Sequence, residues 1–264
     1  MRLIIFLASF LLLFSACQDS SKTTEKTDAP KESTTAATNK YKLTAFSPSQ
    51  SYPDAEIKSV EYNKGKMDFN VADGNYKLGS QTPDAPQKNC ANSDKGQHLH
   101  VIVDENPYAA RYTASFDDLE IEDGEHKMLA FLSRSYHESI KTASAHTALD
   151  FMVENGSITK SVAIENPMIW YSRPKGVYKG KADTDKVMLD FYLINTDLNS
   201  GNKVKADING EIHMLEKWQP YYIEGLEMGK NKITLSLLDK DGNLVKTEQN
   251  PISREFTLEV DPTE

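Results

Sequence analysis

Two histidines separated by one residue, His98 and His100, have the spacing that most clearly allows chemistry. Side chains at positions i and i+2 of a β-strand point the same way, about 7 Å apart. Both imidazoles can therefore contact one metal ion or one anionic ligand. His137, His146 or Cys90 would complete such a site from flanking loops. The pair predicts a copper or zinc site, a site for a non-metal ligand, or ordinary packing under a polar segment.

Arginine follows serine at three places in the chain, and the first of these precedes two further candidate residues. Arg134, Arg173 and Arg254 are the three arginines, and Tyr136 and His137 follow the first. Guanidinium groups bind phosphate and carboxylate in a bidentate manner, and arginine clusters recognise acidic or phosphorylated peptides. Routine polar contacts at the surface are the alternative. For an anionic ligand or peptide we therefore expect a binding set of His98, His100, Arg134, Tyr136, His137 and Arg173.

Motifs of familiar catalytic centres are absent from the sequence. The segment HESIK at His137 is not a zinc-protease helix, because Lys141 stands where the second histidine is required. No nucleophile elbow, phosphate-binding loop or dinucleotide fingerprint appears. A net charge of −9 gives no reason to expect nucleic acid as a partner. The sequence predicts a binding protein rather than an enzyme, with no cofactor apart from the metal of the first alternative.

Short alternating segments separated by tight turns fill the chain from residue 41 onward. The dipeptides that favour hairpin turns are Asp73-Gly74, Asp123-Gly124, Asn155-Gly156, Asn209-Gly210 and Asp241-Gly242. The segments 96–112 and 122–135 return about a hundred residues later as 202–222 and 227–240. This pattern predicts an all-β protein of two tandem immunoglobulin-like β-sandwiches.

The two copies of the repeat differ on one face of a predicted strand. The inner residues of 98–103 match those of 203–208, since both sets are apolar. The outer residues are His98, His100 and Ile102 in the first copy, but Lys203, Lys205 and Asp207 in the second. Leu129 and Phe131 likewise stand where the second copy has Thr234 and Ser236. We therefore expect another part of the structure or a partner to cover the outer face of the first copy.

The N-terminal residues predict export and lipidation. Arg2 precedes an apolar run that ends at Phe14, and polar residues begin at Gln18, too early for a membrane span. Ser15-Ala16-Cys17 resembles the site at which bacterial lipoproteins are cleaved and acylated on cysteine, and Gln18 resembles the residue that directs them to the outer membrane. We expect a signal peptide at 1–16, a lipidated Cys17 and a disordered linker at 17–40, and sandwiches at 41–155 and 156–264.

Several longer segments carry a family resemblance. GQHLHVIVD, MLAFLSRSYHESIKT, MIWYSRPKG and KWQPYYIEGL together resemble an uncharacterised family of two-domain lipoproteins from Bacteroidota, over residues 41–260. Some members of that family are named phosphopeptide-binding proteins. The resemblance implies a cell-envelope lipoprotein, anchored in the outer membrane through Cys17 and facing the periplasm or the cell surface. It assigns no role to any residue.

Overall fold

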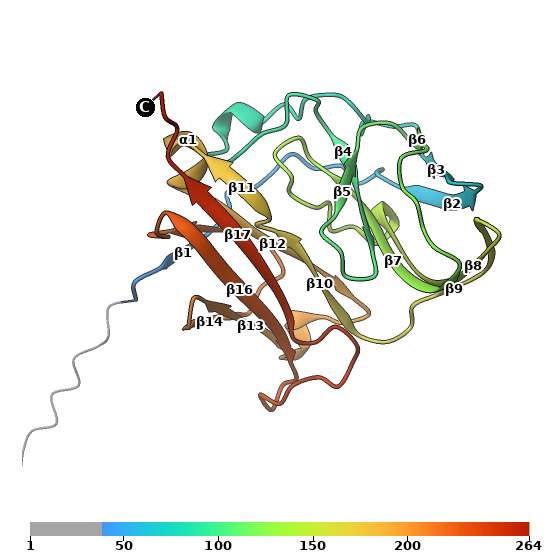
Figure 1. Cartoon of the computed structure of the whole chain (residues 1–264). Helices are drawn as coiled ribbons and strands as arrows, with labels where there is room; N and C mark the ends of the chain where they lie inside the picture. The colour runs from blue at the N-terminus through green and yellow to red at the C-terminus, as the bar shows by residue number, and fades with distance from the viewer. Residues whose placement is uncertain (1–38, 264) are drawn as a thin grey trace, which may run out of the picture. The chain divides into compact units, whose positions relative to one another are not determined.

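The computed structural model describes residues 39–263, which form three β-sheets and only short helices. In Figure 1 the blue-to-green strands β2 to β9 lie together, and the yellow-to-red strands β10 to β17 form the other half. The predicted all-β class is confirmed. The predicted signal peptide, Cys17 and the linker up to residue 38 lie outside the described residues. Within 39–263, no helix has the length and apolar character needed to cross a bilayer.

The first half is an eight-stranded antiparallel sheet with the order β5-β4-β7-β8-β9-β2-β3-β6. Its strands are β2 (Ile57–Asn63), β3 (Lys66–Val71), β4 (His98–Val103), β5 (Ala109–Arg111), β6 (Ser115–Phe116), β7 (Gly124–Ser133), β8 (His146–Glu154) and β9 (Ser157–Ala163). Met67 of β3 shares one apolar cluster with Leu99 of β4 and Met128 of β7. Strands distant in the sheet order thus contribute to a single core, so the sheet curls around its own inner face.

The second half contains two sheets. A four-stranded sheet, β1-β15-β12-β10, is called the middle sheet below, and the other has the order β11-β17-β16-β13-β14. Their strands are β1 (Lys42–Ala45), β10 (Met168–Arg173), β11 (Gly176–Lys179), β12 (Val187–Ile194), β13 (Lys203–Ile208), β14 (Glu211–Leu215), β15 (Tyr221–Glu224), β16 (Gly229–Leu238) and β17 (Ile252–Glu259). The short helices are α1 (Lys181–Thr184) and the 3-10 turns η1 (Ala85–Gln87), η2 (Ala143–Ala145) and η3 (Leu198–Ser200). Among these neighbouring strands only β11 and β17 run parallel.

The middle sheet is buried on both faces where β10 and β12 run. Every residue of these two strands is buried. Ile169 and Phe191 pack toward the five-stranded sheet. Trp170 and Tyr192 point the other way and join a cluster with Phe131 of β7. Burial of each such side chain stabilises the fold by roughly 1.5–3 kcal/mol. The predicted covering of the outer face is confirmed, and it is provided by the same chain.

The chain does not pass from one half to the other at the expected boundary, residue 155. The boundary expected after residue 155 falls in the turn of the β8–β9 hairpin, because Glu154 pairs with Ser157, and β9 stays in the eight-stranded sheet. Strand β1 precedes that sheet in the sequence, yet its Lys42 pairs with Glu224 of β15. Backbone pairing of this kind depends on residues far apart in the sequence, which composition shifts along the chain do not reveal. The chain thus starts in the middle sheet, builds the eight-stranded sheet and then returns.

The central strand pairs of the two larger sheets have the same register at the positions that the predicted repeat matches. In the first copy β4 pairs with β7, with His98 opposite Ser133. In the second copy β13 pairs with β16, with Lys203 opposite Leu238. Positions 98 and 203 are therefore equivalent, and the same spacing relates the other matched residues below. The two strand pairs thus carry different side chains at equivalent positions.

Candidate metal centre

Strand β4 positions the first two histidines of the site. Its side chains alternate, so Leu99 and Val101 enter the core of the eight-stranded sheet. His98 and His100 consequently project from the opposite face, the one that packs against the middle sheet. Both imidazoles are fully buried, at 0% exposure. A histidine pair at i and i+2 on a buried strand face is a rigid start for a ligand site.

The loop after β7 supplies the third histidine. An isolated bridge between Ser133 and Ser139 closes this loop, and within it the backbone amide of His137 donates to the carbonyl of Arg134 at 2.9 Å. His137 has a φ of 68°, in the left-handed region that side chains other than glycine rarely adopt. The equivalent loop of the second repeat has Gly242 there, with a φ of 85°. The first repeat therefore has a histidine at the loop position where the second repeat has a glycine with a similar φ.

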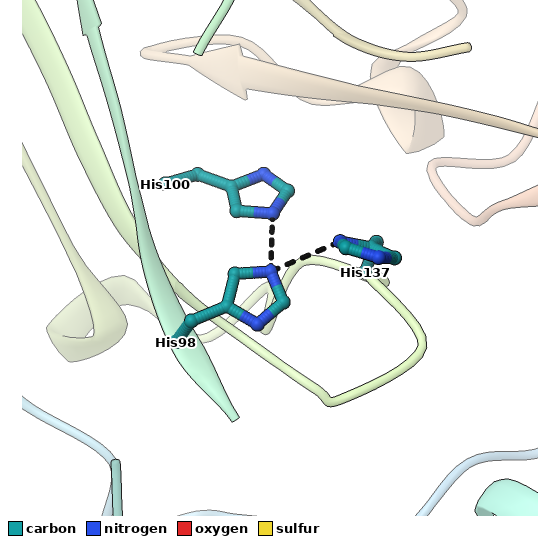
Figure 2. Close-up of side chains that lie close together, drawn as sticks. All are labelled: His98, His100 and His137. Atoms are coloured by element: carbon teal, nitrogen blue, oxygen red, sulfur yellow. Dashed lines mark hydrogen bonds between the residues drawn. The ribbon is translucent and has the colours of Figure 1, made fainter. Parts of the chain in front are cut away.

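The three imidazoles lie close together, and His100 and His137 both approach the same nitrogen of His98, as Figure 2 shows. Nε2 of His98 lies 2.8 Å from Nε2 of His100 and 3.0 Å from Nδ1 of His137. One ligand atom from each residue lies within 4.8 Å of the other two. Nitrogen ligands of a tetrahedral zinc ion, each about 2.0 Å from the metal, are roughly 3.3 Å apart. Two of the separations are shorter than this value and the three nitrogens lie within 4.8 Å of one another, so small adjustments of the rings would bring them to the spacing of metal ligands.

Hydrogen bonding and burial fix the protonation of the cluster. Nδ1 of His98 donates to the carbonyl of Gly96 at 2.8 Å, which leaves the lone pair on Nε2 facing the other two rings. This carbonyl contact to the second ring nitrogen is typical of histidine metal ligands. Burial lowers the pKa of His98 to about 4. Burial, with neighbouring positive groups, also holds the pKa values of His100 and His137 well below the usual range. The imidazoles are thus neutral, as metal binding requires.

The lone pair of His98 cannot satisfy both of its neighbours. Nε2 of His98 accepts one hydrogen bond, but two ring nitrogens, one from His100 and one from His137, lie within hydrogen-bond distance. Each of the other two rings has a second polar neighbour, because Nδ1 of His137 lies 3.5 Å from the Tyr108 hydroxyl and Nδ1 of His100 lies 3.5 Å from the Ser172 hydroxyl. A metal ion would replace the two contacts to Nε2 of His98 by three metal–nitrogen bonds.

Tyr108, which lies between β4 and β5, and two residues of the second half form one wall of the site. The ring of Tyr108 stacks on His100 at 3.6 Å between centroids and an angle of 7°. Nε of Arg173 donates to the Tyr108 hydroxyl at 2.9 Å. Nζ of Lys175 donates to the Tyr108 carbonyl at 2.9 Å and lies 4.0 Å from the centre of its ring. Burial, followed by the charge of Arg173, lowers the pKa of Lys175 to about 8. The site therefore lies between the two halves and has two cationic groups beside it.

The other residues of the predicted anion-binding set make separate internal contacts. Arg134 donates to the carbonyl of Gln50 at 3.0 and 2.6 Å through two of its nitrogens. Tyr136 is fully buried and donates to the carboxylate of Asp84. Arg173 donates to tyrosine hydroxyls, as described for Tyr108. The structure thus brings together His98, His100 and His137 of the predicted set, while Arg134 and Tyr136 contact other partners.

Two residues proposed to complete the site lie outside the cluster. Among residues 39–263 the grouped metal-ligand side chains are His98, His100 and His137, without His146 or Cys90. His146 packs on Tyr192, with 5.1 Å between ring centroids. Cys90 packs beside another cluster, and burial raises the pKa of its thiol to about 12. Neither side chain therefore adds a ligand.

A buried aspartate holds the His137 loop, and sequence reasoning missed it. Asp190 of β12 is fully buried. Its carboxylate accepts the backbone amide of Ser139 at 3.0 Å and Nζ of Lys141 at 2.6 Å. The signal was present, because Asp190 interrupts the apolar run VMLDFYLI of β12. A carboxylate in such a run needs a specific partner, since burying an unpaired charge is costly.

Comparisons with known proteins give only distant structural likeness. No family model and no curated protein matches the chain. Fibronectin(III)-like modules of Clostridium thermocellum CbhA share 12% identity, over 84% of this chain and 97% of that one, with a TM-score of 0.29. The extracellular domain of BT4673 from B. thetaiotaomicron, described as a one-component system, shares 12% identity over 78% of this chain and 36% of that one, with a TM-score of 0.25. The resemblance to the lipoprotein family stays a prediction.

Proposed function

We propose that this protein binds one copper or zinc ion through His98, His100 and His137. The observation that carries the proposal is the convergence of three buried, neutral imidazole nitrogens within 4.8 Å of one another. Imidazole is a ligand that copper and zinc both accept. The ligands come from a strand and from a loop tied to the middle sheet, so the site is preorganised. Such a centre suits binding, storage or transfer of a metal ion.

The geometry favours a metal over an anion. Ring nitrogens 2.8 and 3.0 Å apart leave no space between them for a phosphate or carboxylate group. Neutral imidazoles also attract an anion less than imidazolium does. In addition, the guanidinium of Arg134 is occupied by the carbonyl of Gln50. The short distances between the ring nitrogens therefore distinguish the two hypotheses, because small shifts of the rings would admit one ion but not a phosphate or carboxylate group.

We also propose that the two halves are immunoglobulin-like units of a lipoprotein attached to the outer membrane through Cys17. The equivalent pairing of β4 with β7 and of β13 with β16 supports the repeated unit. The apolar leader and the Ser15-Ala16-Cys17 segment support the anchor. Mass spectrometry of the mature protein would contradict the anchor if Cys17 carried no acyl chains.

Metal titration of protein without a polyhistidine tag tests the site. We expect one equivalent of zinc or of copper to bind and to raise the melting temperature, because a ligand of the folded state stabilises it. His98→Gln and His137→Gln should each lower the affinity by at least about 100-fold, more than the loss of an outer-shell contact. His213→Gln removes a histidine outside the cluster and is the matched control. Unchanged affinity in the cluster variants, or no binding by the wild-type protein, would refute the proposal.

A further inference from the structure

We propose that the three-histidine centre selects the singly charged cuprous ion over divalent ions, including zinc and cupric copper. This inference rests on the metal site of the proposed function and names the ion that it takes. Ligand type does not decide between the metals, because imidazole binds both. Charge decides between them.

The ligands offer no negative charge to a bound ion. All three are neutral imidazoles, and among residues 39–263 no thiolate or carboxylate belongs to the group. His98 and His100 are fully buried, so water compensates poorly for added charge. In the Born description the cost of burying an ion grows as the square of its charge, so a divalent ion costs roughly four times as much as a monovalent one. A neutral, buried ligand set therefore penalises divalent ions most.

Two cationic side chains beside the site add to this penalty. Arg173 and Lys175 both contact Tyr108, whose ring lies 3.6 Å from that of His100. Within the described part of the chain, no carboxylate lies within ion-pair distance of either group. Arg173 instead donates to the hydroxyls of Tyr108 and Tyr178. Coulomb repulsion from these groups is twice as large for a divalent ion as for a monovalent one.

The coordination number points the same way. Zinc takes four ligands, with water as the fourth when the protein supplies three. Here the protein supplies three nitrogens, and the aromatic ring of Tyr108 lies flat against His100. The cuprous ion, which like zinc has a filled d shell and imposes no ligand-field geometry, accepts three nitrogen ligands without a fourth. The cluster thus meets the needs of the monovalent ion without a further ligand.

Competition titrations of the full-length protein test the selection. Cuprous ion, kept reduced by ascorbate without oxygen, is titrated against bathocuproine disulfonate, and zinc is titrated against a zinc chelator dye. We expect cuprous ion to bind at least about 100-fold more tightly than zinc, as the charge penalty implies. Zinc affinity equal to or above that of cuprous ion would overturn the selection and leave the metal site standing. Binding of neither ion would overturn the site itself.

Variants at Lys175 test whether charge is the cause. Lys175→Met removes one cation while keeping an apolar stem over Tyr108. We expect this change to lower the ratio of the cuprous affinity to the zinc affinity by about 10-fold. Lys175→Arg keeps the charge and should keep the preference. Lys230→Met, an exposed lysine of β16 in the five-stranded sheet, is the control for loss of any lysine. Equal preference in Lys175→Met and the wild-type protein would refute the electrostatic basis.

Discussion

The strand pairs β4–β7 and β13–β16 have the same backbone register but carry different side chains. Positions 98, 100 and 137 carry histidine in the first pair and its loop, whereas positions 203, 205 and 242 carry lysine, lysine and glycine. The face of the first pair packs on the middle sheet, and its histidines are buried. In the second pair Lys203 and Lys205 keep partial exposure. The face that packs on another sheet therefore carries the candidate ligand site, whereas the equivalent face of the other strand pair carries solvated lysines.

The loops that close the two strand pairs are held in different ways. In the second repeat Asp239 caps its own loop, because its carboxylate accepts the amides of Asp241 and Asn243. In the first repeat the stabilising carboxylate belongs to Asp190, which reaches the loop from the middle sheet. The His137 loop is thus tied to the other half of the molecule. Its geometry depends on docking between the halves.

The largest expected effect is the loss of stability on removing Asp190, compared with the loss on removing Asp239. Asp190→Ala leaves Lys141 charged and the Ser139 amide unpaired inside the protein, and we expect it to cost about 3 kcal/mol or more of the free energy of unfolding. Asp239→Ala, on the exposed loop, should cost clearly less. Urea denaturation of the metal-free proteins measures both. Equal losses would mean that the two loops are anchored alike.

Exchange of glycine and alanine at the equivalent loop positions gives a smaller effect. His137 and Gly242 share a positive φ, of 68° and 85°. An alanine in this region is strained by about 1 kcal/mol relative to glycine. We expect the free energy of unfolding of His137→Gly to be larger than that of His137→Ala by this amount. The free energy of unfolding of the wild-type protein should be larger than that of Gly242→Ala by the same amount. Thermal denaturation without metal measures each pair, and a reversed order at position 137 would contradict the shared loop geometry.

The smallest expected effect concerns a pair of matched turns. His126 contacts the carboxylate of Asp104 at 2.5 Å and the carbonyl of Glu122 at 2.8 Å. In the second repeat Asn231 makes the same two contacts, with Asn209 at 2.8 Å and the carbonyl of Glu227 at 2.9 Å. One turn therefore carries a titrating pair and the other a neutral one.

The pH dependence of stability should differ between these turns. Burial acts to lower the pKa of His126, but the bonds to Asp104 and Glu122 outweigh it and the pKa is raised. A raised pKa contributes stability that is complete below the unfolded value, near 6.5, and is lost as pH rises through the folded value. We expect a contribution of only about a few tenths of a kcal/mol, the size of an exposed ion pair. The difference in melting temperature between wild type and His126→Asn, followed from pH 6 to 9, should shrink with rising pH, and a constant difference would contradict it.

Local sequence patterns predicted which residues share a face of a strand. The position of the third histidine depends on pairing between strands far apart in the sequence. The alternation of Leu99 and Val101 with His98 and His100 was sufficient to place the histidines on one face, because side chains alternate in any strand. The choice of His137 over His146 as third ligand required the register of β4 on β7, which no local pattern contains. The burial of β12 on both faces was not predicted, although its residues are apolar apart from Asp190, a composition typical of such a strand.

Pairing of β1 with β15 has a consequence for the order in which the molecule can be completed. Lys42–Ala45 leaves the ribosome long before Tyr221–Glu224, its partner in the middle sheet. The first strand made must therefore wait for one of the last, and contacts of such long sequence separation slow folding. A nascent chain that stops short of residue 224 keeps the edge of β1 unpaired and open to other strands. We expect assembly of this protein to be a late, whole-chain event rather than a domain-by-domain one.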